Sequence, residues 1–173
     1  FTNLRELTVW TESDIDKYDL WVGDDIDLTV FPNLEDARLL LDSRKAPAGV
    51  SDIQVRVSGL EHLKSFQVCD KGSNGDGSYS GTDAKIGAID LRGTKELETV
   101  SVSDARGVIF DGGNQIKWIA LSNISGVSSN MFDGFEKLEH LWFRSNAPEF
   151  TQFRAVGLNA LTELMLVNKY LQT

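Results

Sequence analysis

The sequence predicts a mostly-β solenoid of about seven right-handed coils, with stacked parallel strands and few helices. Three observations support this prediction: an apolar spacing that recurs seven times, a weaker second row of short apolar segments, and glycines at a constant distance after that second row. The repeats extend over nearly the whole chain, so we expect one domain over residues 1–173.

The main repeat places apolar residues at n, n+3, n+6 and n+8. Its copies are Phe1, Leu4, Leu7, Val9; Phe31, Leu34, Ala37, Leu39; Leu60, Leu63, Phe66, Val68; Leu97, Val100, Val102 after Thr94; Ile116, Ile119, Leu121 after Gly113; Phe135, Leu138, Leu141, Phe143; and Leu158, Leu161, Leu164, Leu166. Apolar residues at n+6 and n+8 with other side chains between them indicate a strand that turns one face inward. Every copy runs in the same direction with a long return, which predicts parallel stacking.

A second row of short apolar segments lies on the return path. Its members are the segments 26–28, 53–57, 89–91 and 108–110. In three of these coils a glycine follows two residues later, at Gly59, Gly93 and Gly112, which indicates a tight corner with positive φ or a close backbone approach. We therefore expect two parallel sheets, or one sheet facing irregular extended segments. The best helical alternative is the stretch 34–41.

Four stretches of the main repeat resemble leucine-rich repeats: FTNLRELTV, GLEHLKSFQV, FEKLEHLWFRSN and GLNALTELML. The resemblance implies an α/β-type leucine-rich-repeat solenoid that binds a macromolecular partner. In FEKLEHLWFRSN, Asn146 lies near the asparagine position of such repeats; other coils place Ser103 or Asp104, Asn123, and Asn168 or Lys169 there without consistency. The irregular coils are similar to bacterial cell-surface repeats and to receptor L-domains, and fungal and plant F-box proteins carry comparable ones.

The charge and the cysteine content exclude several classes of protein. Asp and Glu number 26 against 17 Lys and Arg, so the net charge is -9, which disfavours nucleic acid and anionic membrane as partners. The single cysteine, Cys69, forbids an intrachain disulfide and a zinc site built on several thiolates. Apolar runs are too short to cross a bilayer, so we expect no membrane insertion. No motif indicates a cofactor.

The candidate binding residues are the side chains that alternate with the inward row, at n+5, n+7 and n+9. Three coils near the C-terminus contribute Trp118, His140, Trp142, Arg144 and Met165, which parallel pairing would bring together. Aromatic residues with Arg and Met are typical of binding hot spots. Two further candidates on the same face are Trp10 and Arg38. The alternative is that a neighbouring domain covers the tryptophans or that they pack on each other.

Metal binding and catalysis have weaker support. The segment from Asp70 to Asp83 alternates oxygen ligands as calcium loops do, but Lys85 stands where an EF-hand counted from Asn74 would have its glutamate, so we predict no metal site. His62 has no carboxylate or nucleophile at a diagnostic spacing, and Cys69 has only Lys71 as a basic neighbour in sequence.

A carbohydrate-cleaving site on a solenoid face needs clustered acids. The acids of the outward face, Glu6, Asp36 and Glu163, lie far apart in the repeat, so we expect no enzyme. The triplet from Asn123 to Ser125 matches the acceptor pattern for glycosylation, and a sugar there would stand at the edge of the exposed face.

We therefore expect a non-enzymatic binding module that recognises a partner through the exposed face of the main sheet. A protein is the first expectation for that partner and a glycan the second. Two alternatives remain: a structural spacer within a larger surface protein, and an F-box-like substrate receptor. We expect the chain to be a fragment of a longer protein, located outside the cell or at its surface, although a cytoplasmic location also fits. A neighbouring repeat or domain is expected to cap each end.

Overall fold

The computed structural model describes residues 1–10, 23–42, 52–70, 86–112, 115–145 and 147–171, and all regular structure in this part is β. The strands are β1 (Glu6–Trp10), β2 (Asp25–Asp27), β3 (Asp36–Leu41), β4 (Gln54–Arg56), β5 (Ser65–Asp70), β6 (Ile86–Asp90), β7 (Thr99–Ser103), β8 (Ala105–Ile109), β9 (Trp118–Ser122), β10 (His140–Arg144) and β11 (Glu163–Val167). The prediction of a mostly-β parallel fold is confirmed. The helical alternative for 34–41 is wrong, because most of that stretch is strand β3.

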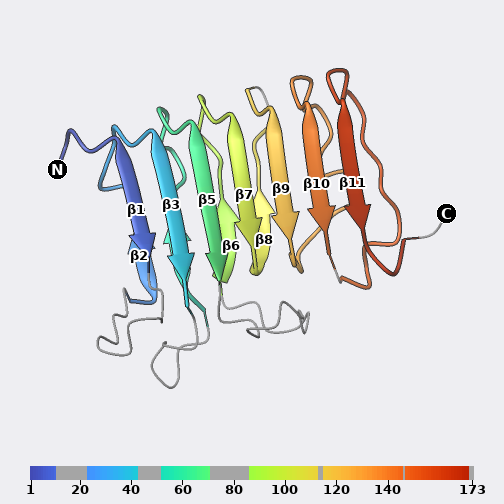
Figure 1. Cartoon of the computed structure of the whole chain (residues 1–173), viewed down its shortest axis with the longest axis horizontal. Helices are drawn as coiled ribbons and strands as arrows, with labels where there is room; N and C mark the ends of the chain where they lie inside the picture. Colours follow the sequence, from blue (N-terminus) through green and yellow to red (C-terminus); the bar gives the residue numbers. More distant parts are fainter. Residues whose placement is uncertain (11–22, 43–51, 71–85, 113–114, 146, 172–173) are drawn as a thin grey trace.

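Seven of these strands form one parallel sheet, in the order β1-β3-β5-β7-β9-β10-β11. The sheet follows chain order from one end of the molecule to the other (Figure 1). Its register aligns equivalent positions of the repeat: Leu39 lies opposite Val68, and Leu121 lies opposite Phe143. Because side chains alternate between the two faces of a strand, this register keeps every apolar position on the same face.

The apolar positions of the sheet form the core of the fold. In the main-sheet strands β3, β5, β7, β9 and β10 the n+6 and n+8 side chains are at most 1% exposed, which confirms the predicted inward face. The strand at the C-terminal end differs, because Leu164 on β11 is 46% exposed. Beneath β10 the Phe143 ring contacts Phe132 and Phe150, at centroid distances of 5.6 and 4.8 Å. This aromatic cluster supports the strand that carries Trp142.

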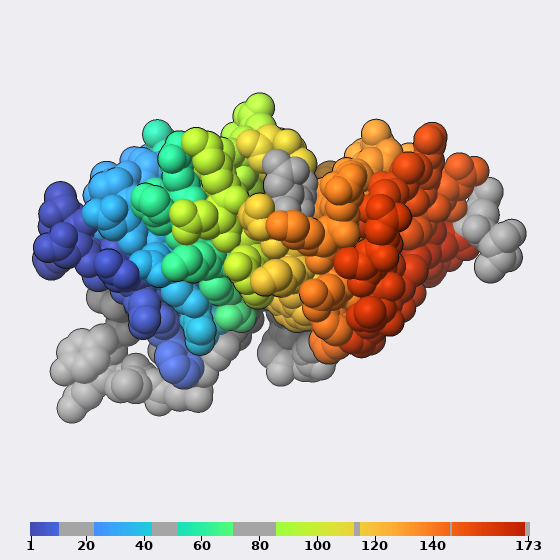
Figure 2. All heavy atoms as spheres, turned by 90° about the horizontal axis from the view of Figure 1, so that it is seen from above, coloured from blue at the N-terminus to red at the C-terminus, as the bar shows by residue number. Residues whose placement is uncertain are grey.

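A second layer of short strands covers the other side of the core. Strand β2 pairs with β4 and β6 with β8, both in parallel, and β6 and β8 lie behind the main sheet (Figure 1). An isolated bridge between Ile53 and Ile86 links the two pairs. Successive segments follow one another along the long axis of the molecule (Figure 2). Short parallel pairs of this kind match the predicted second row.

The glycine corners after the second layer have the predicted conformation. Gly59, Gly93 and Gly112 all have positive φ, with values of 77°, 77° and 113°. A Cβ atom on Gly93 would lie 3.0 Å from the Cα of Gly59, because the two corners stack directly on each other. Glycine therefore serves two purposes at Gly93: it permits the left-handed conformation and it allows the close backbone approach.

Polar residues form a row just after the main strands, at n+10. Asp104, Asn123 and Ser145 are buried there, and Asn123 Nδ2 donates to Asp104 Oδ1 over 2.7 Å. Asn168 continues the row and donates to the carbonyl of Ala147. Asp104 and Asn168, which the sequence left as alternatives to Ser103 and Lys169, thus occupy places equivalent to that of Asn123. In the coil of β10 that place belongs to Ser145, while Asn146 lies outside the described residues.

The same row corrects the glycosylation hypothesis. Asn123 is 8% exposed, has φ of 54°, and uses its amide nitrogen to bond Asp104. In this fold a sugar on that nitrogen would have to displace the bond to Asp104 and could not stand at the edge of the exposed face, as the sequence suggested.

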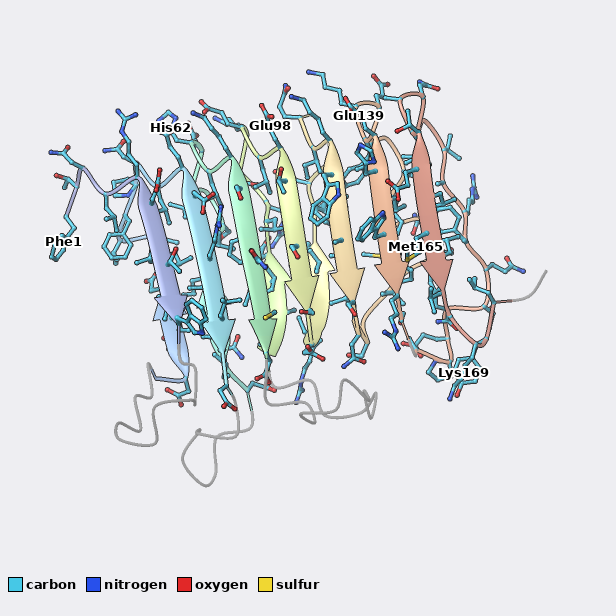
Figure 3. The ribbon with its side chains drawn as sticks, viewed as in Figure 1. Phe1, His62, Glu98, Glu139, Met165 and Lys169 are labelled. Atoms are coloured by element: carbon cyan, nitrogen blue, oxygen red, sulfur yellow. The ribbon has the colours of Figure 1, made fainter. Side chains whose placement is uncertain are left out.

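Charged side chains alternate in sign along the edge where the main strands begin, at n+4. The row reads Arg5, Glu35, Lys64, Glu98, Lys117 and Glu139. Glu35 accepts from Arg5 and from Lys64, at 2.8 and 2.7 Å, and Lys117 pairs with Glu98 at 2.9 Å. Figure 3 shows Glu98 and Glu139 along this edge. The hydrogen bond from Lys64, with a smaller contribution from Arg5, lowers the pKa of Glu35.

Candidate partner-binding face

The structure brings together five of the seven residues that the sequence singled out. Trp118 on β9 lies opposite His140 on β10, and Trp142 on β10 lies opposite Met165 on β11. Arg144 follows on β10, two positions after Trp142. We call these five residues the aromatic patch. Figure 3 shows Met165 over strand β11, on the face turned toward the viewer.

The two tryptophans of the aromatic patch contact each other and also remain open to solvent. Their ring centroids are 6.1 Å apart at an interplanar angle of 57°, within the range of favourable aromatic pairs. Trp142 is 40% exposed and Met165 is 47% exposed, while Trp118 is half-buried. The alternative of mutual packing is therefore confirmed for this pair, but mutual packing leaves a large part of Trp142 uncovered.

Glu163 fixes the orientation of the patch and was missed as a site residue in the sequence. One of its carboxylate oxygens accepts from the Trp142 indole nitrogen at 3.0 Å, and the other lies 3.0 Å from His140 Nδ1. Glu163 is aligned with His140 across the β10–β11 pair. The spacing of the repeat could have predicted the contact between Glu163 and His140, because both residues occupy n+5. A charge-assisted bond to the indole restrains the ring that a partner would contact.

A shallow hollow of about 210 Å³ opens beside the aromatic patch. Its floor consists of small side chains that point outward from β7 and β9, namely Ser101, Ser103, Ala120 and Ser122. Its wall is formed by Trp142, Arg144 and Met165. The sequence places these small residues on the outward face, but it does not mark them as a site, because they become a floor only beside larger neighbours.

A second hollow, of about 370 Å³, lies where the first strands of the main sheet begin. It is lined by polar and charged residues that include Arg5, Glu35, His62, Lys64 and Glu96. These groups already pair with one another: Glu35 binds both basic residues, and His62 Nδ1 lies 3.2 Å from Glu96. Their charges are largely satisfied internally, so this hollow is a weaker candidate for binding.

Trp10 and Arg38 do not join the aromatic patch. They belong to β1 and β3, which strands β5 and β7 separate from β9 in the order of the main sheet. Trp10 is 55% exposed, and Arg38 pairs with Asp36 on its own strand at 3.1 Å. The structure therefore divides the predicted binding residues into two separate groups.

The remaining sequence candidates are located as follows. His62 does have a carboxylate neighbour, Glu96, which comes from the next repeat and so shows no local spacing in the sequence. Cys69 is half-buried on β5. Within the described residues, no group of three or more His, Cys, Asp or Glu side chains is placed to hold a metal ion. The calcium-like loop lies outside the described residues, apart from the buried Asp70.

Comparisons of this chain with protein-family models, with curated proteins and with solved structures found no match. In the part of the chain that the structure describes, no helix is long and apolar enough to span a membrane.

Proposed function

We propose that the chain is a right-handed solenoid of leucine-rich-repeat type and that the outward face of its main sheet binds a protein partner. The in-register parallel strands, the short pairs on the return path, the stacked glycine corners and the buried polar row support the solenoid. Each repeat of such a fold covers the next, which produces an extended rigid face.

The observation that supports binding is an exposed aromatic cluster on a rigid support. Trp142 and Met165 present large apolar surfaces to solvent, while Glu163 and the phenylalanines beneath β10 hold that part of the sheet in place. Preorganised aromatic side chains lose little entropy on binding and are enriched among hot-spot residues. A protein partner is favoured over a glycan, because the patch combines tryptophan with methionine and arginine.

The test compares a double variant, Trp118→Ala with Trp142→Ala, against the single variant Ile109→Ala. Ile109 on β8 has nearly the same exposed fraction as Trp142, 42% against 40%, but belongs to the second layer. Binders selected from a displayed library of protein fragments on the unmodified chain provide the probe. Truncation of one hot-spot residue costs about 2 kcal/mol or more, which is a roughly 30-fold loss of affinity, so we expect at least that loss in the double variant.

The Ile109→Ala control should bind as the unmodified chain does, and all variants should unfold cooperatively in urea. Unchanged affinity in the double variant would contradict the assignment of the face. Equal losses in the double variant and the control would show that the loss is not specific to the main sheet and would contradict the assignment as well.

A structural spacer is the second candidate function, and one observation favours it. Leu164 is 46% exposed, whereas Leu141 at the same register position on β10 is fully buried. A further repeat or domain packed on β11 would cover Leu164. A spacer whose main sheet is also covered predicts that acrylamide quenches tryptophan fluorescence poorly in the full-length protein, whereas an open binding face predicts efficient quenching.

A further inference from the structure

We propose that His140, Glu163 and Trp142 form a pH-sensitive clasp on the outward face of the main sheet. Protonation of His140 strengthens its contact with Glu163, and Glu163 then holds the Trp142 indole in one orientation. When His140 is neutral, the indole is released for part of the time. The clasp is a property of the chain itself, so this inference goes beyond the proposed binding function and does not depend on it.

Glu163 is the shared member of the clasp. Its two carboxylate oxygens serve different residues: Oε1 accepts from the Trp142 indole nitrogen at 3.0 Å, and Oε2 lies 3.0 Å from His140 Nδ1. Both of these residues belong to β10, while Glu163 lies across from them on β11, aligned with His140. Because the two oxygens belong to one planar group, a change in the contact with the imidazole also moves the oxygen that the indole uses.

The protonation state of His140 determines the strength of its contact with Glu163. In a charged imidazolium both ring nitrogens are donors, whereas in a neutral ring one nitrogen donates and the other accepts. A charged donor facing a carboxylate makes a hydrogen bond roughly twice as strong as a neutral pair does. A neutral ring with its proton on Nε2 turns the Nδ1 lone pair toward the carboxylate, which repels it. Loss of the proton therefore weakens the contact.

On the outward face, Glu163 is the acid that His140 meets on the neighbouring strands. Among the described residues, its register partners are Trp118 on β9, which is uncharged, and Glu163 on β11. On β10 itself, Arg144 shares this face and stands four positions further along the strand. The imidazole is thus placed between an aromatic ring and a carboxylate, and the carboxylate is the one that also binds Trp142.

The charged edge where the strands begin does not titrate together with histidine. Glu139 and Lys117 stand there at n+4, one position before the outward row, and Lys117 is paired with Glu98 at 2.9 Å. Carboxylates and ammonium groups ordinarily keep their charges over the range in which histidine loses its proton, roughly pH 5 to 8. Within that range the imidazole is therefore the member that changes.

Contact with water makes the clasp responsive and also limits its strength. The side chains of His140 and Glu163 are 38% and 49% exposed, so protons reach the pair from solvent. Ion pairs in contact with water contribute little, and we expect protonation to shift the balance between the closed and the released clasp by roughly 2- to 5-fold.

A second histidine provides an internal control. The chain contains two histidines in all, and His62 also has a carboxylate neighbour, with Nδ1 lying 3.2 Å from Glu96. His62 precedes β5, which β7 separates from β9 in the order of the main sheet. The variant His62→Gln therefore removes an imidazole of similar surroundings without touching the clasp.

The experiment follows the indole N–H signals of the 15N-labelled chain by NMR between about pH 5 and 8. Trp142→Phe identifies the signal of Trp142, and His140→Gln identifies the imidazole signals of His140. The two residues should titrate with one shared midpoint. At about pH 5.5 the Trp142 indole proton should exchange with water roughly 2- to 5-fold more slowly than in His140→Gln, and near pH 7.5 the two rates should converge.

Glu163→Gln is the decisive variant, because it keeps an acceptor for the indole but removes the charge that the imidazolium meets. The pH-dependent shift of the Trp142 signal should disappear in Glu163→Gln and in His140→Gln, and His62→Gln should retain it in full. A direct effect of the imidazolium on the nearby indole would survive in Glu163→Gln and would overturn the proposal. An absent shift in the unmodified chain, or different midpoints for Trp142 and His140, would overturn it as well.

Discussion

The buried polar row after the main strands makes a quantitative prediction about stability. Replacing Asn123 with alanine removes the hydrogen bond to Asp104 Oδ1 and places a Cβ-bearing residue without a polar group at φ of 54°. Losing a hydrogen bond to a buried polar partner costs about 1–3 kcal/mol. The left-handed conformation costs alanine about 1 kcal/mol. We therefore expect Asn123→Ala to lower the free energy of unfolding by about 3 kcal/mol.

A glycine variant separates the two contributions. Asn123→Gly also lacks the amide but adopts positive φ without strain, so it should lose about 2 kcal/mol, the hydrogen-bond part alone. The control is Asn159→Ala at an exposed position, where surface substitutions change stability by less than about 0.5 kcal/mol. Urea unfolding followed by tryptophan fluorescence and circular dichroism gives the three values.

The three variants should also follow an order of stability: Asn159→Ala most stable, then Asn123→Gly, then Asn123→Ala. A cost within 0.5 kcal/mol of zero for Asn123→Ala, on the same scale of surface substitutions, would refute the structural role of the row. Equal costs for Gly and Ala would refute the contribution of backbone conformation. A changed dependence of the unfolding free energy on urea would instead indicate loss of two-state behaviour.

Three further predictions concern the core, the corners and the charged edge. Leu141→Ala should destabilise the fold by about 2–5 kcal/mol, and Leu164→Ala by far less, since only Leu141 is fully buried. Equal losses of the free energy of unfolding in urea would contradict the exposure of Leu164 at the last strand of the sheet. Gly93→Ala should lower the stability more than Gly59→Ala. The angle φ is 77° at both positions, but only the added Cβ at Gly93 would meet a backbone atom at 3.0 Å. Equal melting temperatures for the two variants would contradict the stacked corners. Glu35 has a lowered pKa when folded, so its stabilising contribution is present above the ordinary value of 4.5 and is lost as pH falls through the folded pKa. Glu35→Gln should therefore show a shallower loss of stability from pH 7 to acid, and an unchanged slope would count against the ion pairs.

The sequence predicted the inward face of the main sheet almost completely. Its physical basis is that burial selects apolar residues strictly, so the spacing n+6 and n+8 survives in every repeat, and Leu121 and Phe143 lie side by side as expected. The corners at Gly59 and Gly93 were predictable for a similar reason, since few residues other than glycine accept their conformation.

The polar contacts between repeats were harder to predict, because they join residues that are distant in sequence. Asn123 reaches Asp104 across 19 positions, and Glu163 reaches Trp142 across 21. The lengths of the returns vary, so neither separation is a constant of the repeat. Each contact becomes visible only when the strands are aligned by their apolar positions and the remaining positions are compared across them.

The hollow beside the aromatic patch shows how such an alignment creates a surface feature that no single motif contains. Across the main sheet the n+7 position passes from large polar side chains at Arg38 and Gln67, through small ones at Ser101 and Ala120, to large apolar ones at Trp142 and Met165. Burial does not constrain these outward residues, so their sizes are open to selection by a partner. A low floor beside a high aromatic wall depends on the order of strands and on their register, because a shift of one residue would replace the outward row by the inward one. The same register that protects the core therefore also positions the proposed binding surface.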